Sequence, residues 1–200
     1  MSRRGLATAA ALVAAVLTVA APAAAERPAK AVEAARAYFG DTVLVDQNGE
    51  ERRFYSDLLA GRVAVIDSMF TTCVAVCPVM GQKMKAIQQA AGDRLGDDVV
   101  LISISVDPTV DTPAELRDYA KRFDAEPGWY FLTGDEANVH AVLAKLGLAV
   151  DSKDDHSTIL LMGNEKTGLW KKTNGLSSSG ELVELFQGVA ADDGSAEVGH

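Results

Sequence analysis

Two cysteines, Cys73 and Cys77, stand in the run TTCVAVCP with three residues between them. This separation lets both sulfurs converge on one metal ion or join as a disulfide. If the following helix starts at Pro78, Cys77 lies near its N-terminus, where unpaired backbone amides and the positive end of the helix dipole stabilise a thiolate. A thiolate is both a nucleophile and a ligand for soft metals. The pair therefore predicts either metal binding or thiol–disulfide chemistry.

A selective metal site needs a further ligand, and the chain has three histidines. His200 ends the chain, and His140 falls inside the predicted helix EANVHAVLAKLG, where a surface or packing role is the ordinary expectation. His156 follows the acidic stretch 151–155 and directly precedes the apolar run STILLMG. Two thiolates and one imidazole make a soft, low-coordinate set that suits copper, whereas zinc usually takes a fourth ligand or a water. A plain disulfide and a surface histidine remain alternatives at this point.

The cysteines lie between a predicted strand and a predicted helix. RVAVIDSMF is an almost continuous apolar run rich in β-branched residues, as expected of a central strand covered on both faces. The stretch from Pro78 predicts a helix that ends at Gly96. Met80 and Met84, four residues apart on this helix, are expected to be core or groove residues rather than metal ligands. The residues expected to share its buried face are Val79, Met80, Lys83, Ile87 and Ala91.

Further elements follow in regular order. DTVLVDQNGEERRF predicts a β-hairpin, because Asn-Gly between β-prone runs is a strong turn signal. The runs that predict strands are VVLISISV, WYFLT, STILLMG and GLWKKT. A helix is expected to begin at Pro113, with Asp111 or Thr112 as its cap. Two more helices are expected, over EANVHAVLAKLG and over 179–189.

This order, a hairpin, then β-α-β-α-β-α and then β-β-α, predicts an α/β protein with a thioredoxin-like fold and an N-terminal β-hairpin addition. Flavodoxin-like folds share the alternating half, but the terminal hairpin and the placement of the cysteines favour the thioredoxin-like plan. In such a sheet the loop before STILLMG packs beside the cysteine loop, so His156 is expected to meet both sulfurs. Asp107 and Asp111 are expected to shape a turn and a helix start rather than to support the site or dock a partner.

The N-terminal residues have the pattern of a targeting signal. Two arginines precede an apolar, alanine-rich run over 5–21, and Ala23 and Ala25 fit the small-residue pattern of a cleavage site. The predicted organisation is a signal peptide (1–25), a leader that is mobile or a short helix (26–38), a copper-binding domain (39–190) and a disordered tail (191–200). We expect export across the inner membrane, a periplasmic location and no stable membrane insertion after cleavage. An uncleaved segment would instead anchor the protein in the membrane.

The charge of the chain limits its partners. Its formal charge is −9, and loss of residues 1–25 would remove two arginines and no acids. Such a field repels phosphate backbones, and no basic patch interleaved with aromatic residues opposes it. Nucleic acid is therefore excluded as a partner. An acidic face favours solubility and could also attract a basic partner or cations.

Three motifs together resemble the Sco/SenC family over residues 39–189. TTCVAVCP is similar to its CxxxC-Pro signature, SISVDPTVDTPAELRDYAKRF to its SxDPxxDTPxxLxxY segment, and DDHSTILLM to its later DHS strand start. The resemblance implies a thioredoxin-like copper chaperone in which Cys73, Cys77 and His156 bind one copper ion as Cu(I) or Cu(II). It also implies a role in assembling the binuclear copper centre in subunit II of cytochrome c oxidase, as metal donor or as reductant of its cysteines.

The chain departs from the family pattern in two respects. Family members are often tethered by a transmembrane helix, whereas this chain is predicted to be released. The turn over 164–168 only approximates the expected aspartate-proline-glycine-like turn.

Three functions compete. The leading hypothesis is a metallochaperone, not an enzyme, that hands copper by ligand exchange to subunit II or to another copper-protein acceptor. The alternative is a thiol–disulfide reductase that needs Cys73 and Cys77 alone. No proline directly precedes STILLMG, where thioredoxin-type enzymes place a cis-proline, and this argues against a general oxidoreductase. A peroxiredoxin-like peroxidase is weaker still, because the cysteine context lacks that family's threonine-proline lead.

Overall fold

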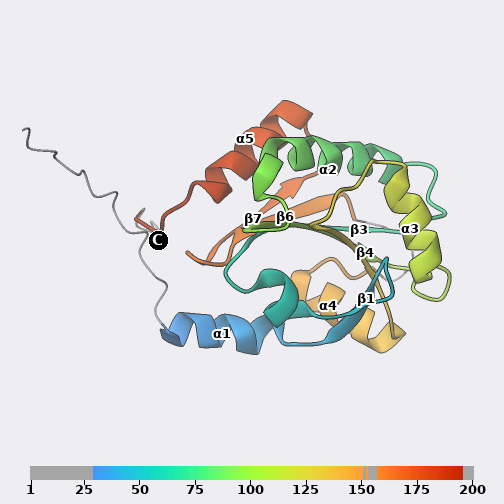
Figure 1. Cartoon of the computed structure of the whole chain (residues 1–200), viewed down its shortest axis with the longest axis horizontal. Coiled ribbons are helices and arrows are strands. Elements are labelled where there is room, and N and C mark those ends of the chain that lie inside the picture. The colour runs from blue at the N-terminus through green and yellow to red at the C-terminus, as the bar shows by residue number, and fades with distance from the viewer. Residues whose placement is uncertain (1–28, 151, 153–156, 196–200) are drawn as a thin grey trace, which may run out of the picture.

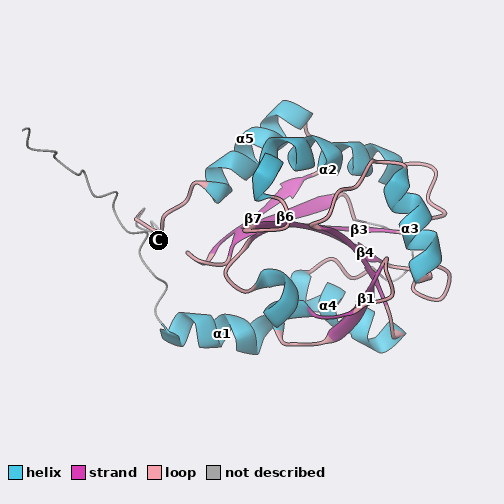
Figure 2. Ribbon diagram, viewed as in Figure 1, coloured by secondary structure: helices cyan, strands magenta, loops and turns pink. Residues whose placement is uncertain are grey.

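The computed structural model describes residues 29–150, 152 and 157–195, and within them seven strands form one mixed sheet with helices on both faces (Figures 1 and 2). The strands are β1 (Val43–Asp46), β2 (Glu51–Arg53), β3 (Val63–Met69), β4 (Val99–Ser105), β5 (Trp129–Thr133), β6 (Ile159–Asn164) and β7 (Leu169–Asn174). The α-helices are α1 (Ala29–Phe39), α2 (Cys77–Ala91), α3 (Pro113–Lys121), α4 (Glu136–Leu146) and α5 (Ser179–Ala190). A π-helical segment, η1 (Phe54–Leu59), and a 3₁₀ turn, η2 (Gly92–Arg94), complete the secondary structure of this part of the chain.

The strand order across the sheet is β2-β1-β5-β4-β3-β6-β7. The central strands β3, β4 and β5 run parallel, and their connections pass through α2 and α3, as parallel neighbours require. The hairpin β1–β2 pairs with β5 in the antiparallel direction, and the hairpin β6–β7 pairs likewise with β3. Two hairpins therefore flank a parallel centre, in the order predicted from the sequence.

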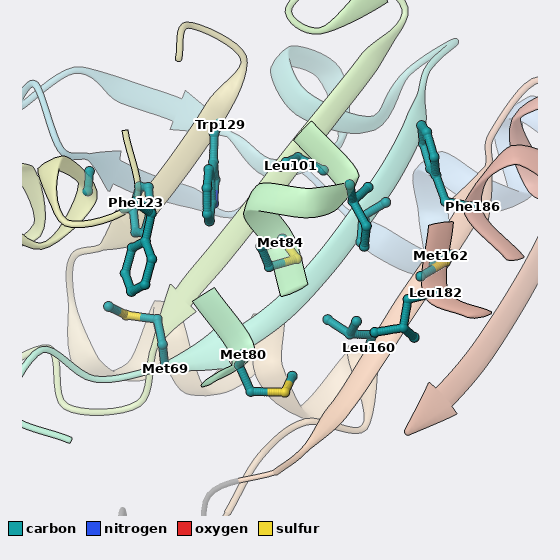
Figure 3. Close-up of a cluster of buried hydrophobic side chains, with 14 of the residues drawn as sticks. Met69, Met80, Met84, Leu101, Phe123, Trp129, Leu160, Met162, Leu182 and Phe186 are labelled. Carbon is teal, nitrogen blue, oxygen red and sulfur yellow. The ribbon is translucent and has the colours of Figure 1, made fainter. Parts of the chain in front are cut away.

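Helices α2, α3 and α5 cover one face of the sheet, and α1, η1 and α4 cover the other (Figure 1). The core beneath α2 contains the methionines Met69, Met80, Met84 and Met162 (Figure 3). The prediction that Met80 and Met84 are core residues is confirmed, since they are 2% and 0% exposed.

The predicted helix after the cysteines is wrong in two details. It ends at Ala91 rather than Gly96, because Gly92 takes a left-handed φ of 54° that stops the helix. Val79 does not share the buried face, since it is 45% exposed in the first turn. Met84, one turn after Met80, packs in the core instead.

The segment predicted as a mobile leader or a short helix forms helix α1. Ala35 and Phe39 on this helix are buried, and the ring of Phe39 lies 5.0 Å from that of Trp170 on β7. Residues 1–28, which include the predicted signal peptide, lie outside the described part of the chain. Over the residues that are described, no helix has the length and apolar character needed to cross a bilayer.

Candidate metal centre

Both cysteines lie where the central strand β3 gives way to α2, as the sequence predicted. The backbone amide of Cys73 donates to the carbonyl of Phe70 (3.2 Å), which turns the chain just after the strand. Cys77 is the first residue of α2, and Pro78 follows it in a position where a missing amide costs nothing. Both side chains are buried, at 5% and 3% exposure. The motif thus places two soft donors at a helix N-terminus, shielded from bulk water.

The two cysteines are free thiols in contact with each other. The backbone amide of Cys77 donates to the sulfur of Cys73 over 3.4 Å. Burial acts to raise the pKa of Cys73, but hydrogen bonds from the Cys77 thiol and from the amides of Cys77, Ala75 and Val76 outweigh it and lower that pKa. Burial, and then the hydrogen bond to Cys73, raises the pKa of Cys77. Cys73 is therefore the sulfur that ionises first.

A buried carboxylate fixes the start of the cysteine loop. Asp111, fully buried, accepts hydrogen bonds from the backbone amide of Thr71 (3.1 Å) and from its hydroxyl (2.5 Å). Its other oxygen accepts from the hydroxyl of Ser105 at the end of β4 (2.5 Å). The cap of α3 is Thr112, whose side chain accepts from the amide of Glu115. Thr112, one of the two predicted candidates, is therefore the cap, whereas Asp111, which was expected to shape the helix start rather than to support the site, anchors the cysteine loop.

The three histidines differ in what the structure says of them. His156 and His200 lie outside the described residues. His140 is exposed on α4, on the face of the sheet opposite α2, which agrees with its predicted surface role. Among the residues that the structure describes, no three His, Cys, Asp or Glu side chains are grouped closely enough to hold a metal ion.

Comparison with known proteins identifies the family. The family model described as SCO1/SenC matches residues 31–190. The chain belongs to the SCO1/SenC family. A SCO2-like protein of Rickettsia felis is 35% identical to it over 159 residues, which cover 74% of this chain and 75% of that protein.

Solved Sco structures have the same fold. Bradyrhizobium japonicum ScoI, whose structure was solved with copper bound, is 28% identical, with a TM-score of 0.61 over 75% of this chain and 98% of that one. BsSco is described as having a disulfide switch and as a member of the Sco family of cytochrome c oxidase assembly proteins. It is 25% identical, with a TM-score of 0.61 over 74% of this chain and 90% of that one. The predicted thioredoxin-like α/β fold is thus confirmed as that of the Sco family.

One acidic residue near this Sco site was missed from the sequence. Asp67 lies in β3 at 2% exposure, and its Oδ1 has no hydrogen-bond partner among the described residues. Burial raises the pKa of Asp67 to about 7. A hydrogen bond with Ser103, which pairs with Asp67 on the adjacent strand β4, acts to lower this pKa but does not outweigh burial. The available signal was a lone acid within the apolar run RVAVIDSMF, where an ordinary strand would have another apolar residue.

Proposed function

We propose that this Sco protein is a copper metallochaperone that binds one copper ion, as Cu(I) or Cu(II), through Cys73, Cys77 and His156. It delivers the ion to the binuclear copper centre of cytochrome c oxidase subunit II, or matures that centre, or serves another copper-protein acceptor. The observation that carries the proposal is the buried, mutually contacting pair of free thiols at the start of α2. The copper-bound ScoI structure and the description of BsSco support it.

The donor set suits copper. Thiolates are the ligands that Cu(I) prefers, and although burial acts to raise the pKa of Cys73, hydrogen bonds that include one from the backbone amide of Cys77 (3.4 Å) lower it. Cys77 holds its proton more tightly in the metal-free protein, so copper loading would release a proton from it. An imidazole from His156 would complete a three-coordinate set.

The path of the chain near residue 156 supports the third ligand. Strand β6 runs antiparallel to β3, so it begins at the edge of the sheet where the cysteine loop starts. The carbonyl of Thr158 accepts a hydrogen bond from the amide of Gly175 (2.7 Å), and Gly175 packs against the side chain of Met80 in α2. Thr158, two residues after His156 in the chain, is therefore held close to helix α2, which begins at Cys77.

Transfer would proceed by ligand exchange. An acceptor thiolate enters the low-coordinate site, and the ligands of this protein leave one at a time, so that copper is never released as a free ion. Burial of both sulfurs keeps water and adventitious ligands out until an acceptor docks.

A thiol–disulfide reductase role remains a second candidate, because the lowered pKa of Cys73 also suits a nucleophile. In that reaction the Cys73 thiolate attacks an acceptor disulfide and one acceptor sulfur leaves as a thiolate. Cys77 then attacks Cys73, and the second acceptor sulfur leaves with the electron pair. The acceptor gains two electrons and two protons, and this protein ends with a Cys73–Cys77 disulfide.

We also propose that residues 1–25 direct export and are then removed, so that the copper-binding domain, residues 39–190, works in the periplasm as part of a chain that begins at Glu26. The alternative is retention of this segment as a membrane anchor. Mass measurement of the protein isolated from the cell envelope separates the two, since cleavage predicts a chain that begins at Glu26.

The decisive experiment is titration of the reduced protein with Cu(I) in competition with a chromophoric chelator, with three variants in parallel. We expect Cys73→Ser, Cys77→Ser and His156→Ala each to weaken binding by more than about tenfold, since each removes one of three ligands. His140→Ala is the matched control and should bind as the wild type does. If His156→Ala binds as tightly as the wild type, the three-ligand proposal is wrong.

A turnover assay separates the second candidate. The substrate is an oxidised peptide with two cysteines, and the readout is the rate of its reduction by the reduced protein. Full activity of His156→Ala in this assay, together with loss of activity in Cys73→Ser, would favour the reductase.

A further inference from the structure

A small pocket beside α1 is lined by lysines and aromatic rings. It has a volume of about 140 Å³ and lies between α1, the C-terminal end of α4 and the hairpin β6–β7. Its lining residues are Tyr38, Phe39, Lys145, Leu146, Leu161, Trp170 and Lys172. The pocket is on the face of the sheet that α1 and α4 cover, whereas the cysteines are on the face that α2 covers (Figure 1).

Contacts between these elements fix the positions of the lining residues. The hydroxyl of Tyr38 donates to the carbonyl of Lys145 (2.8 Å), and the ammonium of Lys145 donates to the carbonyl of Phe39 (3.1 Å). Lys172 approaches from β7, because a Cβ added at Gly147, which ends α4, would lie 2.6 Å from its ammonium nitrogen. Two positive charges from separate parts of the chain therefore lie beside the C-terminal end of α4.

The pocket is positively charged although the chain is acidic. Among the described residues no carboxylate lines it, and neither of its lysines has an ion-pair partner. The acids nearest to it on or just after α1 are Glu33, which is exposed and does not line the pocket, and Asp41, which already accepts hydrogen bonds from Ser56. The two lysines come from distant parts of the chain, so the sequence alone shows no basic patch.

Both lysines have hydrogen-bond donors to spare. An ammonium has three N–H donors, and Lys145 uses one of them on the carbonyl of Phe39. The ammonium of Lys172 donates to no described residue. The negative end of the α4 dipole stabilises cations here, but it does not account for an apolar pocket beside them. The spare donors suit an anionic group such as phosphate, which accepts several hydrogen bonds.

Aromatic and apolar side chains surround the two charges. Tyr38 is 58% exposed although its hydroxyl is hydrogen-bonded, and Val32 on the same helix is 37% exposed. The ring of Trp170 lies 5.0 Å from that of Phe39 in the pocket wall. Lysine, tyrosine and tryptophan beside apolar surface are the side chains that proteins place at the level of lipid headgroups. This composition favours a phosphate that carries apolar chains over a free phosphate.

The place of α1 in the chain supports a membrane as the source of that phosphate. The apolar run over 5–21 is joined to α1 by residues 22–28 alone. A link of this length spans at most about 25 Å when it is fully extended. Whenever the apolar run lies in a bilayer, during export or as an anchor, α1 is therefore held near the lipid surface.

We propose that this pocket binds the headgroup of an anionic phospholipid, so that the protein rests on a membrane through the face that α1 covers, without inserting into it. The two cysteines are buried on the opposite face of the sheet, at the start of α2. They would therefore lie on the side of the domain away from the lipid, where an acceptor can reach them (Figure 1). The inference does not depend on copper.

The test is binding of the chain that begins at Glu26, which contains every described residue, to lipid vesicles. The vesicles contain brominated phosphatidylglycerol or brominated phosphatidylcholine, and the readout is quenching of tryptophan fluorescence at low salt. Trp170 borders the pocket, whereas Trp129, the second of the two tryptophans, is 1% exposed and lies on the other face of the sheet. We expect quenching by the anionic lipid, little by the zwitterionic one, and loss of binding at about 0.5 M salt.

Variants of single lysines locate the contact. Lys145→Gln and Lys172→Gln should each weaken vesicle binding by about fivefold, and Lys172→Arg should bind as the wild type does. Lys171→Gln is the matched control and should change nothing. Lys171 is exposed and adjacent in the chain, but side chains alternate along β7, so it lies on the opposite face from Trp170 and Lys172. Urea unfolding checks that each variant is folded.

Three outcomes would overturn the proposal. One is equal quenching by the zwitterionic vesicles, and another is a loss in Lys171→Gln as large as that in Lys172→Gln. The third is release of the protein from vesicles by millimolar inorganic phosphate at constant ionic strength, which would assign the pocket to a free anion. Because no copper is present, vesicle binding by a protein that fails to bind copper would support this inference and remove only the metallochaperone proposal.

Discussion

Thr71 and Asp111, forty residues apart in the chain, are joined by two hydrogen bonds, with the backbone amide of Thr71 at 3.1 Å and its hydroxyl at 2.5 Å from the same carboxylate. Thr71 is two residues before Cys73, and Asp111 follows the end of β4. The position of the cysteine loop is therefore fixed partly by the loop that follows β4 and not by the sequence of the cysteine loop alone. The first prediction concerns this link.

Replacing Asp111 with Ala should destabilise the protein by about 2–4 kcal/mol, because three buried donors from Thr71 and Ser105 lose their acceptor. It should also weaken copper binding, since the cysteine loop is no longer held. Urea unfolding and copper titration measure the two effects. Asp118→Ala, which removes an exposed ion pair with Lys121, is the control and should change neither. Unaltered copper affinity in a destabilised Asp111→Ala variant would show that the anchor does not position the site.

The two thiols should differ in reactivity. At pH 7 and with limiting iodoacetamide, Cys73 should be alkylated before Cys77, because hydrogen bonds lower the pKa of Cys73 while burial raises that of Cys77. Tandem mass spectrometry of the peptide that carries both cysteines locates the label. In Cys77→Ala the alkylation of Cys73 should move to higher pH, because the thiol that donates to it is gone. Prior labelling of Cys77 would contradict this assignment.

The buried acid in β3 should give the protein a pH-dependent stability. Asp67 has a pKa of about 7 in the folded protein and about 3.9 when unfolded, so the folded state binds the proton more tightly. Stability from this group is therefore fully present below about pH 4 and is lost as pH rises through about 7, by about 2–4 kcal/mol. The Asp67→Asn variant has no carboxyl group at this position, so its free energy of unfolding should not show this decrease as the pH rises. The measurement is the difference between the wild-type and variant unfolding free energies from pH 4 to 8, and a constant difference would contradict the prediction.

Glycines at two helical positions should respond in opposite ways to alanine. A Cβ at Gly81 in α2 would lie 2.3 Å from the ring of Phe123, so Gly81→Ala should cost about 1–3 kcal/mol and disturb the helix that begins at Cys77. Gly188 in α5 has no neighbouring atom within 4 Å of such a Cβ, and Gly188→Ala should stabilise the protein by about 0.5–1 kcal/mol. Denaturant unfolding of both variants tests this, and equal effects would refute it.

The order of the strands and helices was predictable because the apolar runs are long and the turn signals between them are strong. RVAVIDSMF and VVLISISV became β3 and β4, and a glycine or proline lies close to most element boundaries. The end of α2 was misplaced because Gly92 and Gly96 both take left-handed φ angles, and the sequence does not show which one stops the helix.

Within the site, the cysteine pair and its place at the helix start followed from local spacing. The anchoring role of Asp111 could not be predicted from the sequence, because its partner Thr71 is forty residues away. Only the pairing of β3 with β4 brings the two residues together. Asp67 was overlooked because a strand's apolar character outweighs one polar residue in any sequence window. The assignment of His156 remains a prediction, since that residue lies outside the described part of the chain.

Strand β3, which leads into the cysteine loop, lies between β4 and β6, and Val63 pairs with Asn164 about a hundred residues later. A nascent chain that ends before β6 leaves one edge of this central strand bare, with its amides and carbonyls unpaired. This edge is covered only when β6 pairs with β3, and contacts between residues so far apart in the sequence form slowly. The sheet beside the thiol site is therefore complete only when β6, nearly a hundred residues after β3, has been added to it.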